Sequence, residues 1–279
     1  MTDQAQAFVP GHVTGFFTSD PDPDPVKTGS RGGGLALSDG VTVSVRPADE
    51  TTVFLGDVSV EMGAVGRVLD ALGVSARVRA ETELPPGTGF GVSGAVALGA
   101  VLAANQVFDC RLSENELVTI AHGAEVQAGT GLGDVVAQAR GGVPLRLEPG
   151  GPQVNKLDAI PARTRVEYVV RGELDTAEIL GGDTAALTAA GEQALAEVVS
   201  EPTLETFMRA SRRFSREAGL LTEGVQEIVT DVTEAGGTAA MAMLGQTVIA
   251  LDTGLSDAGY DPSVCHVHSG GATVLAAED

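Results

Sequence analysis

Alternating apolar and polar residues predict several strands in the first half of the chain. Val41–Arg46 alternates Val with Thr, Ser and Arg, Ala76–Thr82 alternates in the same way, and Thr51–Leu55 is a shorter β-rich run. A period of two residues is typical of a strand with one buried face. These runs therefore predict an antiparallel or mixed sheet.

Helical periodicity appears between and after these strands. Val60–Leu72 carries apolar residues at helical spacing, and Gly73 stands where a helix ends. Ala95–Val107 is apolar on almost every side, which predicts a buried helix. Ser113 and Glu116 have the spacing of a capping box and predict that a further helix begins there and runs to about residue 127.

The second half of the chain has fewer strands and longer helices. Glu148–Pro152 holds two Gly and two Pro, which favours a linker. Arg165–Val170 is the next predicted strand, and three β-rich runs follow toward the C-terminus. Helices are expected near Thr184–Ser200, Leu204–Ala218 and Thr222–Ala235. We therefore predict an α+β protein of two domains, residues 1–150 and 151–279.

Composition excludes several classes of protein. Hydrophobic residues make up 43% and charged residues 20%, so the chain is neither disordered nor collagen-like despite its 37 glycines. The longest run without a strongly polar residue, Gly94–Ala104, is far shorter than the roughly 20 residues of a membrane span. Cys110 and Cys265 are far apart, which predicts free thiols. A soluble cytoplasmic protein is expected.

The charge balance is strongly acidic. Lys and Arg total 17 against 38 Asp and Glu, a net charge of −21, and Lys27 and Lys156 are the two lysines. Nucleic acid is excluded as a partner because phosphate binding needs a basic surface. Few lysines, few aromatics and many acids favour a protein that works in concentrated salt, where screening removes self-repulsion. Ordinary acidity remains the alternative.

The segment Leu84–Ala95 carries the clearest chemistry. Glycines let its backbone N–H groups turn toward one point, and the helix behind adds a positive dipole end, so the segment is suited to an anion. A P-loop is excluded, because it needs a Gly-Lys-Ser/Thr sequence at the end of the loop and neither lysine of the chain lies in this segment.

A dinucleotide fingerprint is a second interpretation of the same segment. Gly89, Gly91 and Gly94 spell G-x-G-x-x-G before a helix. Pro85–Pro86 interrupts the expected tight turn, however, and no acidic residue stands at a strand end about 20 residues later. A glycine-rich turn that only packs tightly is the third alternative.

Residues Pro86–Ala95 resemble the central motif of the GHMP kinases, with Val92 where most members carry a first serine. Val9–Val13 is similar to the first motif of that family, and Gly236–Gly245 is a looser match to the third. The three segments occur in the family's order. The resemblance implies a two-domain fold, with an N-terminal ribosomal-protein-S5-like domain and a C-terminal ferredoxin-like α/β sandwich.

The resemblance also implies ATP as co-substrate and Mg²⁺ as cofactor. Ser93 and Glu125 would bind the metal, and Asp134, in a glycine-rich turn, would be the catalytic base. Two ordinary exposed carboxylates are the alternative. The residues implied for binding the ATP phosphates are Pro86, Gly87, Gly89, Gly91, Val92, Ser93 and Gly94.

The opening Pro10–Phe17, together with Gly29–Gly32 and Met241–Leu251, is similar to the archaeal branch of the family that phosphorylates pantoate on the route to coenzyme A. The resemblance implies pantoate as acceptor, with binding residues Ser30, His122, Arg146 and Thr184. A solvent-facing Arg146 and an N-cap role for Thr184 are alternatives.

Other acceptors and assemblies stay open at this point. Homoserine or mevalonate type kinases, and a non-catalytic nucleotide-binding protein, remain alternatives to the pantoate branch. A homodimer is expected from the frequency of such assemblies.

Salt dependence is testable directly. If the acidic surface is adapted to screening, the melting temperature rises between low and multimolar KCl, because added salt removes repulsion among the 38 acidic side chains. Thermal unfolding followed by circular dichroism measures this. An unchanged melting temperature would contradict the hypothesis.

Overall fold

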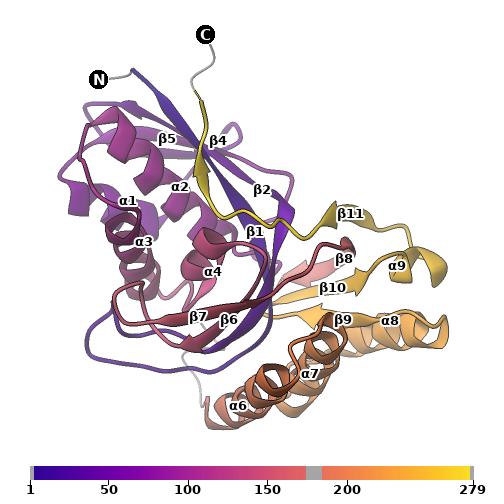
Figure 1. Ribbon diagram of the computed structural model, residues 1–279. Helices are drawn as coiled ribbons and strands as arrows, with labels where there is room; N and C mark the ends of the chain where they lie inside the picture. Colours follow the sequence, from indigo (N-terminus) through magenta and orange to yellow (C-terminus); the bar gives the residue numbers. More distant parts are fainter. Residues whose placement is uncertain (1–2, 174–183, 277–279) are drawn as a thin grey trace.

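The computed structural model describes residues 3–173 and 184–276, which form two sheets with helices packed on them (Figure 1). In the first sheet the main strand order is β12-β1-β2-β5-β3-β4, and β6 and β7 extend it from β2. Its strands are β1 (Ala5–Phe17), β2 (Gly32–Pro47), β3 (Thr52–Leu55), β4 (Val58–Val60), β5 (Ala76–Glu81), β6 (Val143–Glu148), β7 (Lys156–Ile160) and β12 (Thr273–Val274).

The second sheet has the order β11-β8-β10-β9, with every neighbouring pair antiparallel. Its strands are β8 (Arg165–Glu173), β9 (Ala239–Ala242), β10 (Gly245–Leu251) and β11 (Ser263–His266). The helices of this half are α6 (Ala185–Ser200), α7 (Leu204–Glu217), α8 (Glu223–Glu234) and α9 (Gly254–Asp257). Figure 1 shows α7 and α8 lying along one face of the second sheet.

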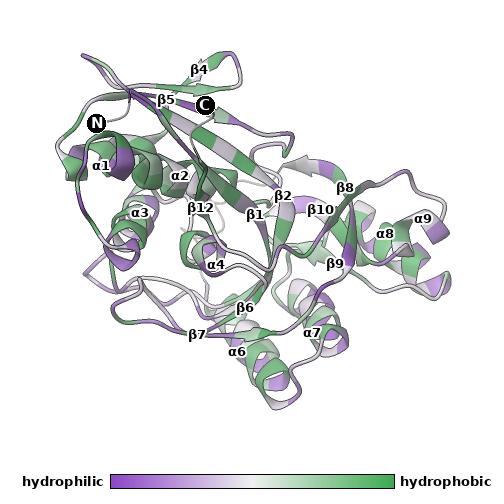
Figure 2. Ribbon diagram, turned by 45° about the horizontal axis from the view of Figure 1, so that its top comes forward, coloured by the Kyte–Doolittle hydropathy of each residue, from purple (hydrophilic) through white to green (hydrophobic). Residues whose placement is uncertain are grey.

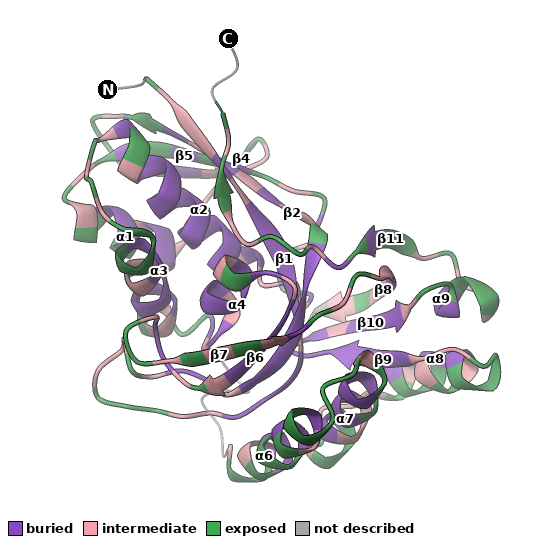
Figure 3. Cartoon of the chain, viewed as in Figure 1, coloured by how far each residue is buried: buried purple, intermediate pink, exposed green. Residues whose placement is uncertain are grey.

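Helix α2 (Val92–Val107) is the core of the first half. It is hydrophobic and buried along most of its length (Figures 2 and 3), because it lies between β1 and β2 on one side and other helices on the other. A Cβ on Gly99 would stand 2.5 Å from the Val43 side chain, so this glycine permits the close approach of helix to sheet. The packing fixes where the N-terminus of α2 points. Its neighbours are α1 (Gly63–Leu72), α3 (Glu114–Ala128) and α4 (Asp134–Arg140).

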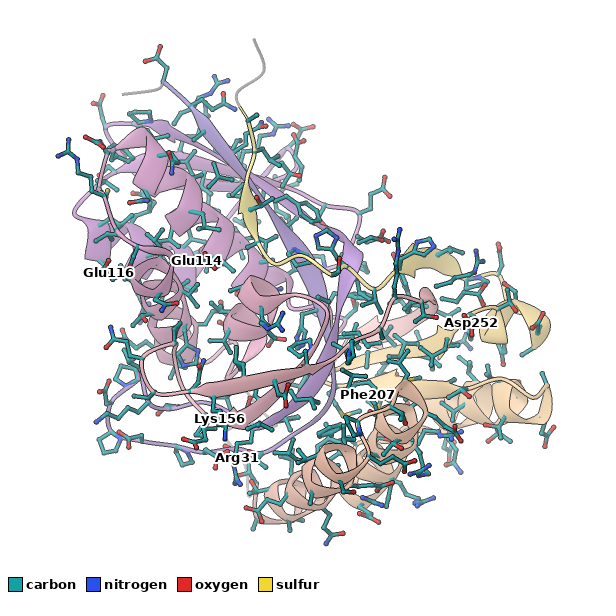
Figure 4. The ribbon with its side chains drawn as sticks, in the orientation of Figure 1. Arg31, Glu114, Glu116, Lys156, Phe207 and Asp252 are labelled. Atoms are coloured by element: carbon teal, nitrogen blue, oxygen red, sulfur yellow. The ribbon has the colours of Figure 1, made fainter. Side chains whose placement is uncertain are left out.

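The two halves meet along the end of β1. The ring of Phe16 packs against that of Phe207 on α7, with 5.6 Å between the ring centres (Phe207 is labelled in Figure 4). The ring centres of Phe17 and Phe214 are also 5.6 Å apart. A Cβ on Gly191 of α6 would stand 2.1 Å from the Phe17 carbonyl oxygen. Strand β1 therefore supports both halves of the molecule.

The expected α+β architecture is confirmed, with differences at particular elements. The capping box is present, since the Ser113 N–H donates to Glu116 over 2.8 Å. The helix expected over Val60–Leu72 begins only at Gly63, because Val58–Val60 pairs with β3 in a hairpin.

The segment expected to be a linker leads into a hairpin rather than into a new domain. Strand β7 pairs with β6, so the first sheet continues to Ile160, and β12 returns to pair with β1 near the C-terminus. The division at residue 150 stays a prediction. Among the described residues no helix is long and apolar enough to cross a membrane.

Candidate active site

The glycine-rich loop between β5 and α2 adopts a conformation that needs its glycines. Gly87, Gly89 and Gly91 have φ angles of 75°, 94° and 63°, in the left-handed region that side chains disfavour. A Cβ on Gly91 would also stand 3.2 Å from Asp134 Oδ1. The loop therefore turns tightly enough for α4 to pack directly against the start of α2.

The turn between β9 and β10 presses on the other side of this loop. A Cβ on Gly245 would stand 1.9 Å from the Thr88 carbonyl oxygen, and the Thr247 hydroxyl donates to the same oxygen over 2.7 Å. The loop is thus held between the first sheet's helices and the second sheet.

Ser93 and Glu125 meet at the N-terminus of α2. The Ser93 hydroxyl donates to Glu125 Oε1 over 2.7 Å, and Glu125 is 2% exposed. Burial raises the pKa of Glu125 to about 7, against the hydrogen bond from Ser93. In the described part of the chain Glu125 forms no ion pair, so it is a buried carboxyl that lacks a cation.

Asp134 stands at the first turn of α4 and pairs with His12 of β1. His12 Nδ1 donates to Asp134 Oδ1 over 2.7 Å, and the ring of His12 is fully buried. Burial lowers the pKa of His12 in spite of the neighbouring carboxylate, so the ring is neutral and carries its proton on Nδ1. The space for the ring depends on Gly34, where a Cβ would stand 2.1 Å from His12 Nε2.

Asp134 remains ionised at neutral pH. Burial works to raise the pKa of Asp134, but the hydrogen bond from His12 and the positive charge of Arg146 outweigh it and hold the pKa below its usual range. The side chain keeps 22% of its surface exposed. An ionised, partly accessible carboxylate is suited to accept a proton.

The two carboxyl groups face one small space. A Cβ on Gly131 would stand 2.9 Å from Glu125 Oε2 and 3.3 Å from Asp134 Oδ2. Since Ser93 bonds to Glu125, the structure brings together the three side chains expected at the chemical centre. No group of three or more His, Cys, Asp or Glu suited to a metal occurs among the described residues.

A pocket opens beside Asp134 and contains Arg146. Arg146 is 2% exposed, donates through Nε to the Ser30 carbonyl oxygen over 3.2 Å, and leaves Nη1 buried without a partner among the described residues. Burial lowers the pKa of Arg146 to about 10, so the guanidinium stays charged at neutral pH. The solvent-facing alternative for Arg146 is therefore wrong. The pocket is lined by Thr14, Phe17, Ser30, Leu132, Gly133, Asp134, Arg146 and Leu244.

The pocket is small. Its volume is about 20 Å³, enough for one water molecule.

His122 and Thr184 do not line this pocket. His122 is buried and donates through Nε2 to the Thr28 carbonyl oxygen over 2.8 Å, so it fixes the segment that ends at Ser30. Thr184 precedes α6, and its side chain makes no capping hydrogen bond. Thr184 nevertheless occupies the N-cap position of its alternative, since its carbonyl oxygen accepts from the Thr188 N–H over 2.8 Å. Its role at an acceptor stays a prediction.

Sequence reasoning missed two polar contributors to the site. From the sequence, His12 is only one residue of the motif Val9–Val13, yet its ring bonds to Asp134 across 122 positions of sequence. Gln138 donates to the Gly91 carbonyl oxygen over 2.9 Å. The signal that could have found Gln138 is its spacing of four residues from Asp134, which places both side chains on one face of a helix.

Comparison with known proteins shows the family and the fold of the chain. Residues 60–142 match the model of the GHMP kinases N terminal domain, a range that holds the glycine-rich loop and Asp134. The chain is 32% identical to pantoate kinase of Methanocaldococcus jannaschii over 94% of this chain and 99% of that protein. It is also 32% identical to pantoate kinase of Thermococcus kodakarensis, covering 88% and 87%.

A solved structure described as a phosphotransferase related to the CoA biosynthesis pathway has a TM-score of 0.87 at 27% identity, covering 98% of each chain. The expected two-domain kinase fold is thereby confirmed, and the dinucleotide interpretation of the loop is set aside. The chain belongs to the GHMP kinase family.

Proposed function

We propose that the protein is an ATP-dependent pantoate kinase that phosphorylates a hydroxyl of pantoate to give 4-phosphopantoate for coenzyme A biosynthesis. The observation that carries the proposal is the buried Arg146, whose Nη1 has no partner among the described residues and which lines the same pocket as Asp134. A buried unpaired guanidinium favours a carboxylate ligand. Pantoate offers a carboxylate and a hydroxyl in one small molecule, and the pantoate kinases named above are relatives over most of this chain.

Homoserine fits this pocket less well. Its ammonium group would need an acidic partner in addition to the catalytic base. Asp134 is the one acidic residue that lines the pocket in the described part of the chain, and Arg146 would repel the ammonium. The pocket therefore favours an acceptor whose charge is negative.

ATP phosphates are expected at the glycine-rich loop. Backbone N–H groups from Gly87 to Ser93 and the positive end of α2 supply donors for an anion without any lysine. Pro86, Val92 and Gly94 complete the predicted phosphate-binding segment.

Ser93 and Glu125 fit a magnesium ion. A buried carboxyl with a raised pKa and no cationic partner is the kind of group that a divalent cation stabilises. Mg²⁺ is usually held by one or two carboxylates together with phosphates and water, so a third acidic ligand is not required. When bound, Mg²⁺ neutralises charge on the phosphates during transfer.

Asp134 acts on the acceptor. It accepts the proton of the pantoate hydroxyl as the oxygen forms a bond to the γ-phosphorus and the bond to the β,γ-bridging oxygen breaks, releasing ADP. His12 keeps the carboxylate oriented and ionised. The segment that ends at Ser30 forms the acceptor side of the site. The Ser30 carbonyl oxygen accepts from Arg146, and His122 holds the same segment through the Thr28 carbonyl oxygen.

A coupled ADP-release assay in high KCl tests the substrate. With Mg²⁺ and ATP present, turnover is expected with pantoate. Galactose lacks a carboxylate for Arg146, and homoserine would place its ammonium beside Arg146, so neither is expected to be phosphorylated. Mevalonate and shikimate carry both a carboxylate and a hydroxyl, so they are the stricter test of pantoate as the acceptor. Turnover with a different acceptor would overturn the substrate and leave the kinase class intact.

Asp134→Asn tests the base. The amide keeps an oxygen to accept from His12 but cannot accept the substrate proton, so kcat falls by about 10²–10⁴-fold. The dissociation constant for ATP, measured by calorimetry, stays within a few-fold. Turnover close to that of the wild type would show that Asp134 is not the base.

Glu125→Gln tests the metal site through stability as well as activity. The native pKa of about 7 lies above the value of about 4.5 in the unfolded chain. Below pH 4.5 the carboxyl is protonated in both states, so it does not lower the free energy of unfolding. Above pH 7 it is ionised in both states, so the whole free-energy cost of burying the anion lowers the stability of the native state. The variant is therefore expected to be more stable than the wild type at pH 8, by about 2–3 kcal/mol, with little difference at pH 5. Its kinase activity falls at both pH values.

Urea unfolding at the two pH values measures this difference. The matched control is Glu114→Gln, an exposed carboxyl on the same helix (labelled in Figure 4), for which no gain in stability at pH 8 is expected because no buried charge is removed. Equal stability of wild type and Glu125→Gln at pH 8 would contradict the buried, unpaired state of this carboxyl.

A further inference from the structure

Leu244 has an unusual backbone conformation. It occupies the turn between β9 and β10 with a φ of 63°, in the left-handed region that a leucine rarely adopts. Such a residue persists only where the surroundings fix it, and residues of this kind cluster at ligand-binding sites.

The surroundings of this turn do fix it. The N–H of Met243 donates to the carbonyl oxygen of Thr14 in β1 over 2.8 Å. On the other side, Gly245 packs against the carbonyl oxygen of Thr88 so closely that a Cβ would stand 1.9 Å away. The turn is therefore anchored to the central strand and to the phosphate loop, and Leu244 is held between the two.

The place where Leu244 is held is the wall of the acceptor pocket. Phe17 and Leu132, from two other segments, supply the rest of the apolar lining. Arg146 and Asp134 are the charged groups of the same pocket. A ligand that joins a carboxylate to a hydroxyl through an unbranched polar chain would leave this apolar lining uncovered.

Alkyl groups in the middle of the acceptor would cover the lining. Pantoate carries two methyl groups on the carbon between its carboxylate half and its terminal hydroxyl. Burying each methyl against leucine and phenylalanine side chains is favourable, because apolar surface leaves water on both sides.

We infer that Leu244 is a specificity-determining residue, whose side chain packs against the paired methyl groups of pantoate and selects acceptors that are branched at that carbon. The inference rests on the proposed function. To the proposed function, the inference adds a residue from a turn of the second sheet that discriminates among acceptors. Asp134 and Arg146 interact with the hydroxyl and the carboxylate that all these acceptors share.

Two acceptors and two variants test the inference. The ratio of kcat/KM for pantoate to kcat/KM for 2,4-dihydroxybutanoate, which lacks both methyls, is measured for the wild type, Leu244→Gly and Leu244→Asn. Glycine and asparagine both tolerate a positive φ, so the turn is retained. Because the two acceptors compete for the same enzyme, the ratio does not depend on the fraction of folded protein.

The expected result is a wild-type ratio above about 10, since a single methylene in an apolar pocket is worth about 10–200-fold. Both variants are expected to lower this ratio by about tenfold, mainly through a higher KM for pantoate. The matched control is Arg111→Gly, an exposed residue with the same backbone conformation beyond the C-terminal end of α2, which leaves the ratio unchanged.

The outcomes separate the inference from the proposed function. A wild type that phosphorylates pantoate, together with variants whose ratio stays within twofold of it, overturns the role of Leu244 alone. A wild type that phosphorylates neither acid overturns the proposed function, and the inference with it.

Discussion

The buried hydrogen bond between His12 and Asp134 is the constraint on which the site depends. His12 lies in β1, the strand that contacts both halves of the molecule, and its own N–H donates to the carbonyl oxygen of Phe90 over 2.9 Å. Gly34 leaves room for the ring, and Gly91 leaves room for Asp134. Through its backbone N–H and its ring, His12 thus joins the first sheet to the glycine-rich loop and to α4. This geometry is fixed because a buried polar group that loses its partner is costly.

Two neighbouring carboxyl groups have opposite properties for physical reasons. Glu125 is sealed from water with a serine hydroxyl as its partner, so burial dominates and its pKa rises. Asp134 has a histidine donor and a nearby guanidinium, so its pKa falls. Groups whose environments separate their pKa values in this way are suited to different tasks. The first is suited to hold a cation that restores its charge, and the second to take a proton at neutral pH.

The parts of this structure that depend on local sequence were predictable. The glycine-rich loop, the buried helix after it and the capping box at Ser113 each depend on a short run of residues. The family resemblance implied Ser93, Glu125 and Asp134, and the structure brings these three side chains together. Long-range contacts were not predictable. Nothing local reveals that His12 meets Asp134 or that β7 returns to the first sheet, since each depends on how distant segments pack. For Arg146 the local pattern left a solvent-facing position open, and the family resemblance alone implied the inward one that the structure shows. Leu244 escaped notice because its conformation is set by Thr14 and Thr88, which are far away in sequence.

The acidic composition sets a problem that the site solves locally. A chain of net charge −21 repels both ATP and a carboxylate acceptor at long range. The groups suited to attract such anions lie at the candidate site itself: the backbone amides of the glycine-rich loop, the positive end of α2 and the charged Arg146. At 1 M salt the screening length is about 3 Å, so repulsion from the distant surface is removed while hydrogen-bonded contacts persist. Concentrated salt would therefore favour substrate binding as well as folding, because both depend on short contacts that oppose a long-range repulsion.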